Sequence, residues 1–413
     1  MNPLVSNMSG FFVTTPNLHR MSHSHSLRSS IRAFPRTFWV LVCAQFVAKF
    51  GVFVIPFLTL FATRKGFSES DAGLAAGAYS VGSFGAAILG GWFADRIGRN
   101  VSMAFASLAG AGCMLAFSQA ETLAWMISLA LLTGLVQESG NPATSALIQD
   151  LIPPEHRVNA YAVLRFAVNL GWSLGPACAG WLAEHSFTWL FLGDAATSAV
   201  FGIIALLALP KGNPSPPGKA GWSLALKDIA TNRAFLGLAA AQVFFAFTFR
   251  QMNTTFPLHF DRQGHPLHVY GWIQAMNGVL ICTLELVLLS FTRTGSMRGL
   301  MGLGYAILAS SYLLFFAGST VAIFVLVMIV FTLGEMFAFS RQSAYMAHLS
   351  REDMRGRYSG FLSLSWCIGS STGAVLGLQL YGESPQVLWT LCSVFGIAAA
   401  ACVITSGRAA TNS

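Results

Sequence analysis

The feature that most constrains this chain is a succession of long apolar segments separated by short charged turns. Apolar residues make up 54% of the 413 residues, charged residues make up 10%, and the mean hydropathy is +0.60. A soluble domain usually carries about a quarter charged residues, and a helix needs about 20 residues to cross a bilayer. The sequence therefore predicts an all-α membrane protein with many spanning helices.

Twelve such segments divide into two sets of six. They lie at about 37–62, 72–94, 101–118, 122–148, 158–182, 188–209, 235–260, 269–291, 298–317, 320–346, 358–381 and 386–406. We predict a disordered cytoplasmic N-terminal tail over 1–36, an N-terminal six-helix bundle over 37–209, a cytoplasmic linker over 210–234, a C-terminal six-helix bundle over 235–406 and a cytoplasmic C-terminal tail over 407–413. The linker begins with four prolines and two glycines in ten residues, a composition that does not form a regular helix.

Basic residues are distributed unevenly between the two sides that this topology defines. With the N-terminus inside, the cytoplasmic side receives seventeen lysines and arginines, and the outer side receives only Arg64, Lys65 and Arg262. Positive charge in short loops is retained on the cytoplasmic side of a membrane. We therefore expect both termini in the cytoplasm and the protein in a cell membrane, with a bacterial inner membrane as the expected location.

A short charged turn, Gly91-Trp92-Phe93-Ala94-Asp95-Arg96-Ile97-Gly98-Arg99-Asn100, follows the second segment. Asp95 and Arg99 are four residues apart, a spacing that places two side chains on the same face of a helix. The pattern resembles the loop between the second and third helices of the major facilitator superfamily, although the family usually has a basic residue where Asn100 stands. The resemblance implies twelve helices in two bundles and transport by alternating access.

The resemblance also implies a conformational latch on the cytoplasmic side. Its residues would be Gly91, Asp95, Arg96, Gly98, Arg99 and Asp150, with Asp150 at the cytoplasmic end of the fourth span. Asp95 would face the start of the eleventh span, near Tyr358. The alternative is a solvated loop that only sets the topology; the match to the motif favours the latch.

Two further stretches are similar to motifs of antiporters in the same superfamily. Gly171, Gly175, Pro176 and Gly180 in the fifth span resemble the family's antiporter motif, although close helix packing alone also explains small residues four apart. Gly334-Glu335, followed by Arg355-Gly356-Arg357-Tyr358, resembles the drug–proton antiporter-like branch. Ala130 stands where those antiporters often carry an arginine.

Ionisable residues inside the spans are the other informative feature, because each costs about 2.5–3.5 kcal/mol at mid-bilayer. They are Lys49, Glu138, Arg250 and Glu335, in helices that line the central cavity of the superfamily. Polar residues share a helical face with them, notably Gln45, Asn141 and Asn253. Arg165, Asp194, Glu285 and Arg341 also lie in spans, and we interpret these four as structural pairs.

The four central charges allow two interpretations. In the first, Glu138 and Glu335 carry protons, because a carboxyl group shielded from water can exchange a proton near neutral pH. Lys49 and Arg250, with Gln45, Asn141 and Asn253, would then bind an anionic substrate. In the second interpretation, the glutamates form permanent ion pairs with Lys49 and Arg250, and the charges only balance one another.

Other classes of protein are disfavoured by the motifs that the chain lacks. The seven cysteines have no paired spacing, and we find no nucleotide-binding glycine motif, no metal-ligand pair and no Ser/His/Asp arrangement. We therefore expect no enzyme activity, no cofactor, no metal site and no nucleic-acid partner, and we expect a monomer in the lipid bilayer.

The function that these observations favour is proton-coupled antiport, in which a small amphipathic molecule is exported. A drug or a secreted metabolite such as a carboxylate metallophore would fit the two cations Lys49 and Arg250. Uptake of an organic anion uses the same fold and stays open. A transport-inactive membrane sensor or assembly partner is the alternative from another class.

Overall fold

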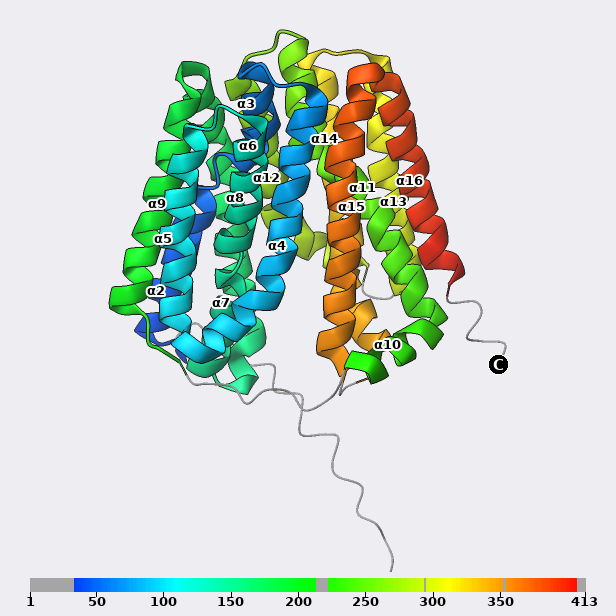
Figure 1. Ribbon diagram of the computed structural model, residues 1–413. Helices are drawn as coiled ribbons and strands as arrows, with labels where there is room; N and C mark the ends of the chain where they lie inside the picture. The colour runs from blue at the N-terminus through cyan, green and yellow to red at the C-terminus, as the bar shows by residue number, and fades with distance from the viewer. Residues whose placement is uncertain (1–32, 213–221, 293–294, 352–353, 407–413) are drawn as a thin grey trace, which may run out of the picture.

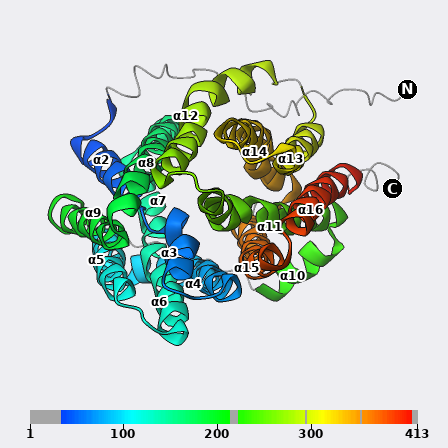
Figure 2. The same ribbon diagram turned by 90° about the horizontal axis from the view of Figure 1, so that it is seen from above.

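The computed structural model describes residues 33–212, 222–292, 295–351 and 354–406, and the described chain is almost entirely helical. The helices stand roughly parallel in two groups (Figures 1 and 2). The first group consists of α2 (Arg36–Phe50), η2 (Ile55–Phe57), α3 (Leu58–Arg64), α4 (Glu69–Ile97), α5 (Arg99–Ser118), α6 (Leu123–Gln137), α7 (Gly140–Leu151), η3 (Pro154–His156), α8 (Arg157–His185) and α9 (Phe187–Ala208). The second consists of α10 (Trp222–Thr231), α11 (Arg233–Arg262), α12 (Leu267–Phe291), α13 (Met297–Leu313), η4 (Leu314–Ala317), α14 (Val321–Leu349), α15 (Arg355–Glu383) and α16 (Pro385–Thr405).

These elements make the twelve predicted spans in two six-helix bundles. Ten helical segments in the described chain are long and apolar enough to cross a membrane. Helices α8 and α12, which pack against each other, are the remaining two of the twelve spans. The described chain begins and ends at the same end of the molecule (Figure 1). We call this end, where α2 begins and α16 ends, the terminal face, and the opposite end the distal face.

Two spans that the hydropathy predicts as continuous helices are broken. The first span stops at Phe50 and resumes in η2 at Ile55, and the fourth stops at Gln137 and resumes in α7 at Gly140. Glu138 lies at the second break. The apolar composition continues through the first break, so hydropathy gives no sign of it, whereas the second break falls in the short polar stretch Gln137-Glu138-Ser139-Gly140-Asn141 of an otherwise apolar span.

The predicted linker contains a helix that the sequence did not indicate. Helix α10 lies at the terminal face, beside α11 and α15 (Figure 1). The Tyr358 hydroxyl at the start of α15 donates a hydrogen bond of 2.7 Å to Asp228 in α10. Residues 1–32 of the predicted tail and residues 213–221 of the predicted linker lie outside the described residues, and the domain boundaries stay a prediction.

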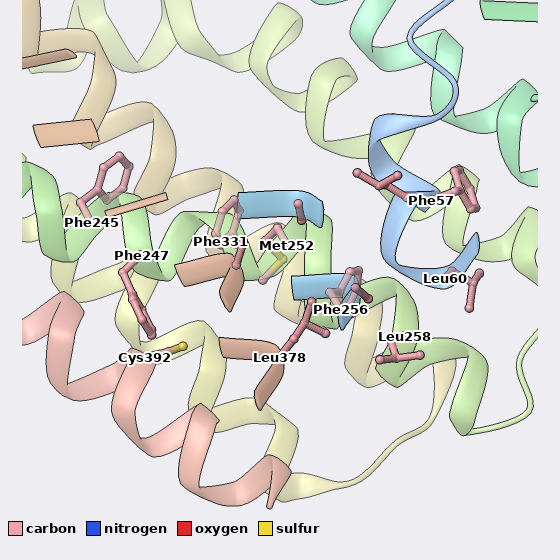
Figure 3. Packing of buried hydrophobic residues seen from close by; sticks show 14 of the residues in the cluster. Phe57, Leu60, Phe245, Phe247, Met252, Phe256, Leu258, Phe331, Leu378 and Cys392 are labelled. Carbon is pink, nitrogen blue, oxygen red and sulfur yellow. The ribbon is translucent and has the colours of Figure 1, made fainter. Parts of the chain in front are cut away.

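The bundles are joined by a hydrophobic core near the distal face. Phe57 and Leu60 in the first bundle lie close to Phe256 and Leu258 on α11 in the second (Figure 3). The rings of Phe57 and Tyr270 are 5.3 Å apart and meet edge to face. A separate core inside the first bundle, which includes the start of α2, lies toward the terminal face. The core thus connects the bundles at one end only.

Candidate functional site

A cavity of about 490 Å³ lies between the bundles and has walls from both. The polar residues that line it include Tyr79, Ser83, Glu138, Asn141, Ser145, Arg250, Asn253, Ser363 and Ser370. Its aromatic walls are Phe249 and Trp366, whose ring centroids are 5.5 Å apart. The cavity therefore combines ionisable, amide and aromatic groups, as a binding site for a polar organic molecule requires.

The fourth span places Glu138 at this cavity because the helix is interrupted there. One carboxylate oxygen of Glu138 accepts a hydrogen bond from the Tyr79 hydroxyl at 3.2 Å, and the other accepts one from Asn141 Nδ2 at 2.5 Å. Glu138 is thus held by neutral donors from α4 and α7. Among the described residues it has no cationic partner within 4.0 Å, so the ion pair with Lys49 or Arg250 that the second interpretation requires is not formed here.

Arg250 on α11 reaches across the cavity to the first bundle. Its Nη2 donates a hydrogen bond of 3.1 Å to the carbonyl oxygen of Ala76 on α4. Its Nε is buried and has no hydrogen-bond partner in the described part of the chain, where the guanidinium also has no carboxylate within 4.0 Å. A positive charge with this few partners can accept an anionic group of a ligand.

Glu335 on α14 lies in an adjoining cavity of about 260 Å³ that shares Phe249 and Asn253 with the main one. Asn277 of α12 donates a hydrogen bond of 2.8 Å to Glu335 Oε2. Within the described chain no basic side chain lies within 4.0 Å of this carboxylate. Nearby, Arg165 and Glu285 pair at 2.5 Å between α8 and α12, as the sequence interpretation expected.

Gln45 and Lys49 do not line the main cavity. They line a separate cavity of about 50 Å³ inside the first bundle, which Glu138, Asn141 and Asp194 also line. Gln45 Nε2 donates a hydrogen bond of 2.8 Å to Thr144 Oγ1. The structure therefore brings Glu138, Asn141, Arg250 and Asn253 together around the main cavity, whereas Gln45 and Lys49 meet Glu138 and Asn141 only at the small one.

The charged turn between α4 and α5 folds as a compact unit at the terminal face. Gly98, with φ +94°, occupies a backbone conformation that favours glycine. Arg99 is 3% exposed and pairs with Asp150 at 3.0 Å. The backbone amide of Arg99 donates to the carbonyl oxygen of Lys211, and Gly212 lies against the Arg99–Asp150 pair, where a Cβ would come within 2.7 Å of Asp150 Oδ2.

The remaining residues of the predicted latch differ in what the structure shows of them. Arg96 lies over the ring of Trp92 at 4.4 Å, and Gly91 has open space where a side chain would be. The side chain of Asp95 lies outside the described residues, so its expected approach to Tyr358 does too. The Arg99–Asp150 pair is the part of the cluster that the structure shows.

The small residues of α8 pack against two different helices. A Cβ on Gly171 or Gly175 would meet the backbone of α2 within 2.8 Å and 2.4 Å, respectively. A Cβ on Gly180 would meet the Leu267 carbonyl oxygen of α12 at 2.6 Å, and Pro176 packs against Gly271 of α12. The stripe thus allows close packing both within the first bundle and between the bundles.

Polar contacts close the cavity toward the distal face. Arg64 pairs with Asp261 at 2.7 Å, Arg262 pairs with Glu69, and Thr59 Oγ1 donates to the carbonyl oxygen of Thr254 at 2.7 Å. On the side of α4 and α15, these helices touch in their distal halves, where a Cβ on Gly73 would meet the Ala374 carbonyl oxygen at 2.7 Å. They diverge toward the terminal face (Figure 1).

Sequence reasoning missed the roles of Tyr79 and Asp194. Tyr79 binds Glu138, and Asp194 is 2% exposed next to the broken part of the first span. Asp194 was interpreted as a structural pair, but the described residues give it no cationic partner within 4.0 Å. For Asp194, the signal available in the sequence was an acidic residue in an otherwise apolar span.

Two helical bundles around a polar cavity with ionisable groups at membrane depth define a secondary transporter. The sequence matches the Major Facilitator Superfamily over residues 41–374. The chain therefore belongs to this superfamily, whose members are transporters of small molecules and not enzymes.

Similar proteins come from bacteria. The chain is 27% identical to a protein named Na(+), Li(+), K(+)/H(+) antiporter of Planococcus maritimus, over 76% of this chain and 82% of that protein. It is 24% identical to the multidrug resistance protein MdtH of Aeromonas salmonicida, over 87% of this chain and 92% of that protein.

Solved structures share the fold at low sequence identity. The peptide transporter POT in complex with sulfate superposes with a TM-score of 0.76 at 15% identity, over 93% of this chain and 98% of that chain. A bacterial homologue of the human lysosomal transporter Spinster, in an inward-facing and occupied conformation, gives a TM-score of 0.72 at 14% identity, over 92% of this chain and 97% of that chain.

Proposed function

We propose that this transporter exports small amphipathic molecules, anionic ones included, in exchange for protons. The observation that carries the proposal is the set of ionisable groups around the two adjoining cavities. Glu138, Arg250 and Glu335 are all held by neutral partners, and none of them pairs with another within 4.0 Å among the described residues. Charges at membrane depth are costly, so charges without permanent partners favour a role in binding or transport.

The substrate proposal rests on the main cavity. Arg250 offers a guanidinium to an anionic group, Asn253 and Asn141 offer amides, and Phe249 with Trp366 offers aromatic faces to an apolar body. A ligand carrying one carboxylate and one apolar portion satisfies all of these groups. Drugs and secreted metabolites such as carboxylate metallophores have this chemistry.

The coupling proposal assigns the protons to Glu335 and Glu138. A carboxylate at a cavity wall with only neutral donors binds a proton at small electrostatic cost and releases it when water reaches it. Glu335 lines the second cavity, next to the shared residues Phe249 and Asn253. The names of the relatives, a cation/proton antiporter and a multidrug resistance protein, support antiport and efflux.

The proposed orientation in the membrane rests on the basic residues. The seventeen to three distribution of basic residues places the terminal face in the cytoplasm, and the relatives suggest a bacterial inner membrane. The structure is then closed toward the outside, with its main cavity extending to the cytoplasm. We propose that the cluster of Gly91, Asp95, Arg96, Gly98, Arg99 and Asp150 stabilises the opposite conformation by meeting the second bundle.

The proposal is tested with purified protein in liposomes and two dyes, anionic carboxyfluorescein and cationic ethidium. The dye retained after filtration is measured with an acidic lumen and with equal pH on both sides. An acidic lumen should stimulate carboxyfluorescein uptake. Glu335→Gln should reduce that stimulation by about tenfold or more, and a tenfold lower rate corresponds to about 1.4 kcal/mol of activation free energy. Glu155→Gln, at an exposed position in η3, should behave as wild type.

The same experiment separates the alternatives. Stimulation by an alkaline lumen instead would indicate uptake of organic anions together with protons. If neither gradient changes the movement of either dye, and Glu138→Gln and Glu335→Gln have no effect, the transport proposal is wrong and a sensor or assembly partner is favoured.

A further inference from the structure

We propose that the small cavity inside the first bundle binds one monovalent cation, with Asp194 as its main ligand. The cavity measures about 50 Å³ and has walls from α2, α4, α5, the fourth span and α9. Measured in the same way, a polar cavity needs only about 10–15 Å³ to hold one water molecule. There is therefore room for a small ion with part of its hydration shell and too little room for an organic substrate.

Asp194 supplies a ligand that nothing in the described protein occupies. Its Oδ1 accepts hydrogen bonds from Gln137 Nε2 at 3.3 Å and from Ser198 Oγ at 3.4 Å. Its Oδ2 is buried and accepts no hydrogen bond of normal geometry among the described residues, although the backbone amides of Phe53 and Val54 are directed at the carboxylate and stabilise its charge. Leaving a buried carboxylate oxygen without a partner is costly, so this oxygen points to a ligand.

The broken spans add negative potential at the same place. Helix α2 ends at Phe50 and helix α6 ends at Gln137, and Lys49 and Gln137 in their last turns line the cavity. The C-terminal end of a helix carries a partial negative charge, and such ends in broken membrane helices are suited to binding small cations. Two of them converge on Asp194.

The charged groups of the walls leave room for one positive charge. These groups are Lys49 from α2, Glu138 at the end of α6 and Asp194 from α9, and the Tyr79 hydroxyl from α4 is the other titratable group. Both oxygens of Glu138 accept hydrogen bonds, as expected of a carboxylate, and Lys49 has no carboxylate within 4.0 Å in the described chain. When both carboxylates are ionised, they and the one ammonium give a net charge that one monovalent cation neutralises, whereas a divalent cation would leave an excess.

The site is placed where an ion could affect transport. Glu138 and Asn141 line both the small cavity and the main one, so they separate the proposed ion from the proposed substrate. Only this coupling rests on the proposed function; binding of the cation does not.

The test measures binding to the full-length protein in detergent. Thermal unfolding is followed in NaCl, LiCl, KCl and choline chloride at equal ionic strength, and radioactive sodium binding is measured directly. We expect saturable sodium binding and a higher unfolding temperature in NaCl or LiCl than in choline chloride. Asp194→Asn should abolish both effects, and Glu155→Gln should retain them.

Asp194→Asn is a buried change and can fail to fold, so Ser198→Ala provides the second test. It removes one oxygen next to Asp194 without changing the charge, and we expect sodium affinity to fall several-fold in a folded protein. Equal unfolding temperatures in all four salts, no saturable sodium binding, or unchanged binding in Asp194→Asn would overturn the proposal. Dye transport driven by pH in sodium-free liposomes tests the proposed function separately, so either idea can fail alone.

Discussion

At the scale of single residues, charges at membrane depth are held mainly by neutral groups. Tyr79 and Asn141 hold Glu138, Asn277 holds Glu335, and a backbone carbonyl holds Arg250. A permanent ion pair would be stable but inert, because separating it would leave two uncompensated charges. The neutral partners instead leave each charge available to a proton or a ligand, in line with the proposed antiport.

Glycines provide a residue-scale prediction that does not depend on function. Gly175→Ala should destabilise the protein by about 1–3 kcal/mol, because overpacking a tight contact costs that much. The new Cβ would lie 2.4 Å from the Phe50 carbonyl oxygen. Thermal unfolding in detergent, followed by tryptophan fluorescence, measures the change.

Gly112→Ala in α5 is the matched control. Nothing lies within 4 Å of the added Cβ, so the replacement should be neutral or stabilising by up to about 1 kcal/mol through helix propensity. If both variants unfold at the same temperature, the close approach of α8 to α2 does not contribute to stability.

At the scale of elements, hydropathy was sufficient to predict the spans because each spanning helix needs a long apolar segment. It could not predict the break at Gly51, because the apolar character continues through it, whereas the polar stretch Gln137-Glu138-Ser139-Gly140-Asn141 marks the second break, and averaging over a whole span conceals it. It also missed α10, since a ten-residue helix at the surface leaves no long apolar run. Breaks and surface helices depend on contacts with other elements, which a local pattern does not contain.

The candidate site was predictable to the same limited extent. A charge inside an apolar span identified Glu138, Arg250 and Glu335, which line the adjoining cavities. Helical spacing alone also grouped Lys49 with the cavity, but in the folded protein Lys49 lines the small cavity instead. Partners such as Tyr79 come from other helices and needed the three-dimensional structure.

The contact of α10 with α15 gives an element-scale prediction. Tyr358→Phe removes the hydroxyl that donates to Asp228 and keeps the ring that packs 4.5 Å from Phe235. We expect α10 to detach more often, so trypsin should cleave faster after the exposed Lys227. Gel electrophoresis over a digestion time course measures the rate.

Thr231→Ala is the control for this digestion. Among the described residues the Thr231 hydroxyl bonds only to a carbonyl oxygen within α10, that of Asp228, so its loss should leave cleavage unchanged. Equal cleavage rates for Tyr358→Phe and wild type would show that the hydroxyl does not hold α10.

At the scale of the whole molecule, the two faces differ in what joins the bundles. The distal face has ion pairs and a shared hydrophobic core, whereas α4 and α15 diverge toward the terminal face (Figures 1 and 3). Rocking of the bundles must break the distal contacts before the distal side can open. The distal ion pairs should therefore set the balance between the two conformations.

This balance can be shifted by charge. Arg262→Glu places a like charge against Glu69 and should increase the population that is open at the distal face. Spin labels introduced through unnatural amino acids at the exposed Glu121 and Gln386 leave the native cysteines intact. Pulsed electron spin resonance should then show a longer distance component.

Exchanging the two charges is the control. Arg262→Glu combined with Glu69→Arg should restore the wild-type distance distribution. If the single variant already gives the wild-type distribution, the pair does not hold the distal face closed.

The break in the first span has a consequence for how the protein is made. Its Gly51 packs against Thr197, one helical turn from Asp194, in the sixth span. The ribosome delivers the first segment long before the sixth, so the early helix reaches the bilayer without the neighbour that completes it. Folding of the N-terminal half should thus stay incomplete until the sixth span is inserted, and until then this half should be susceptible to quality-control proteases.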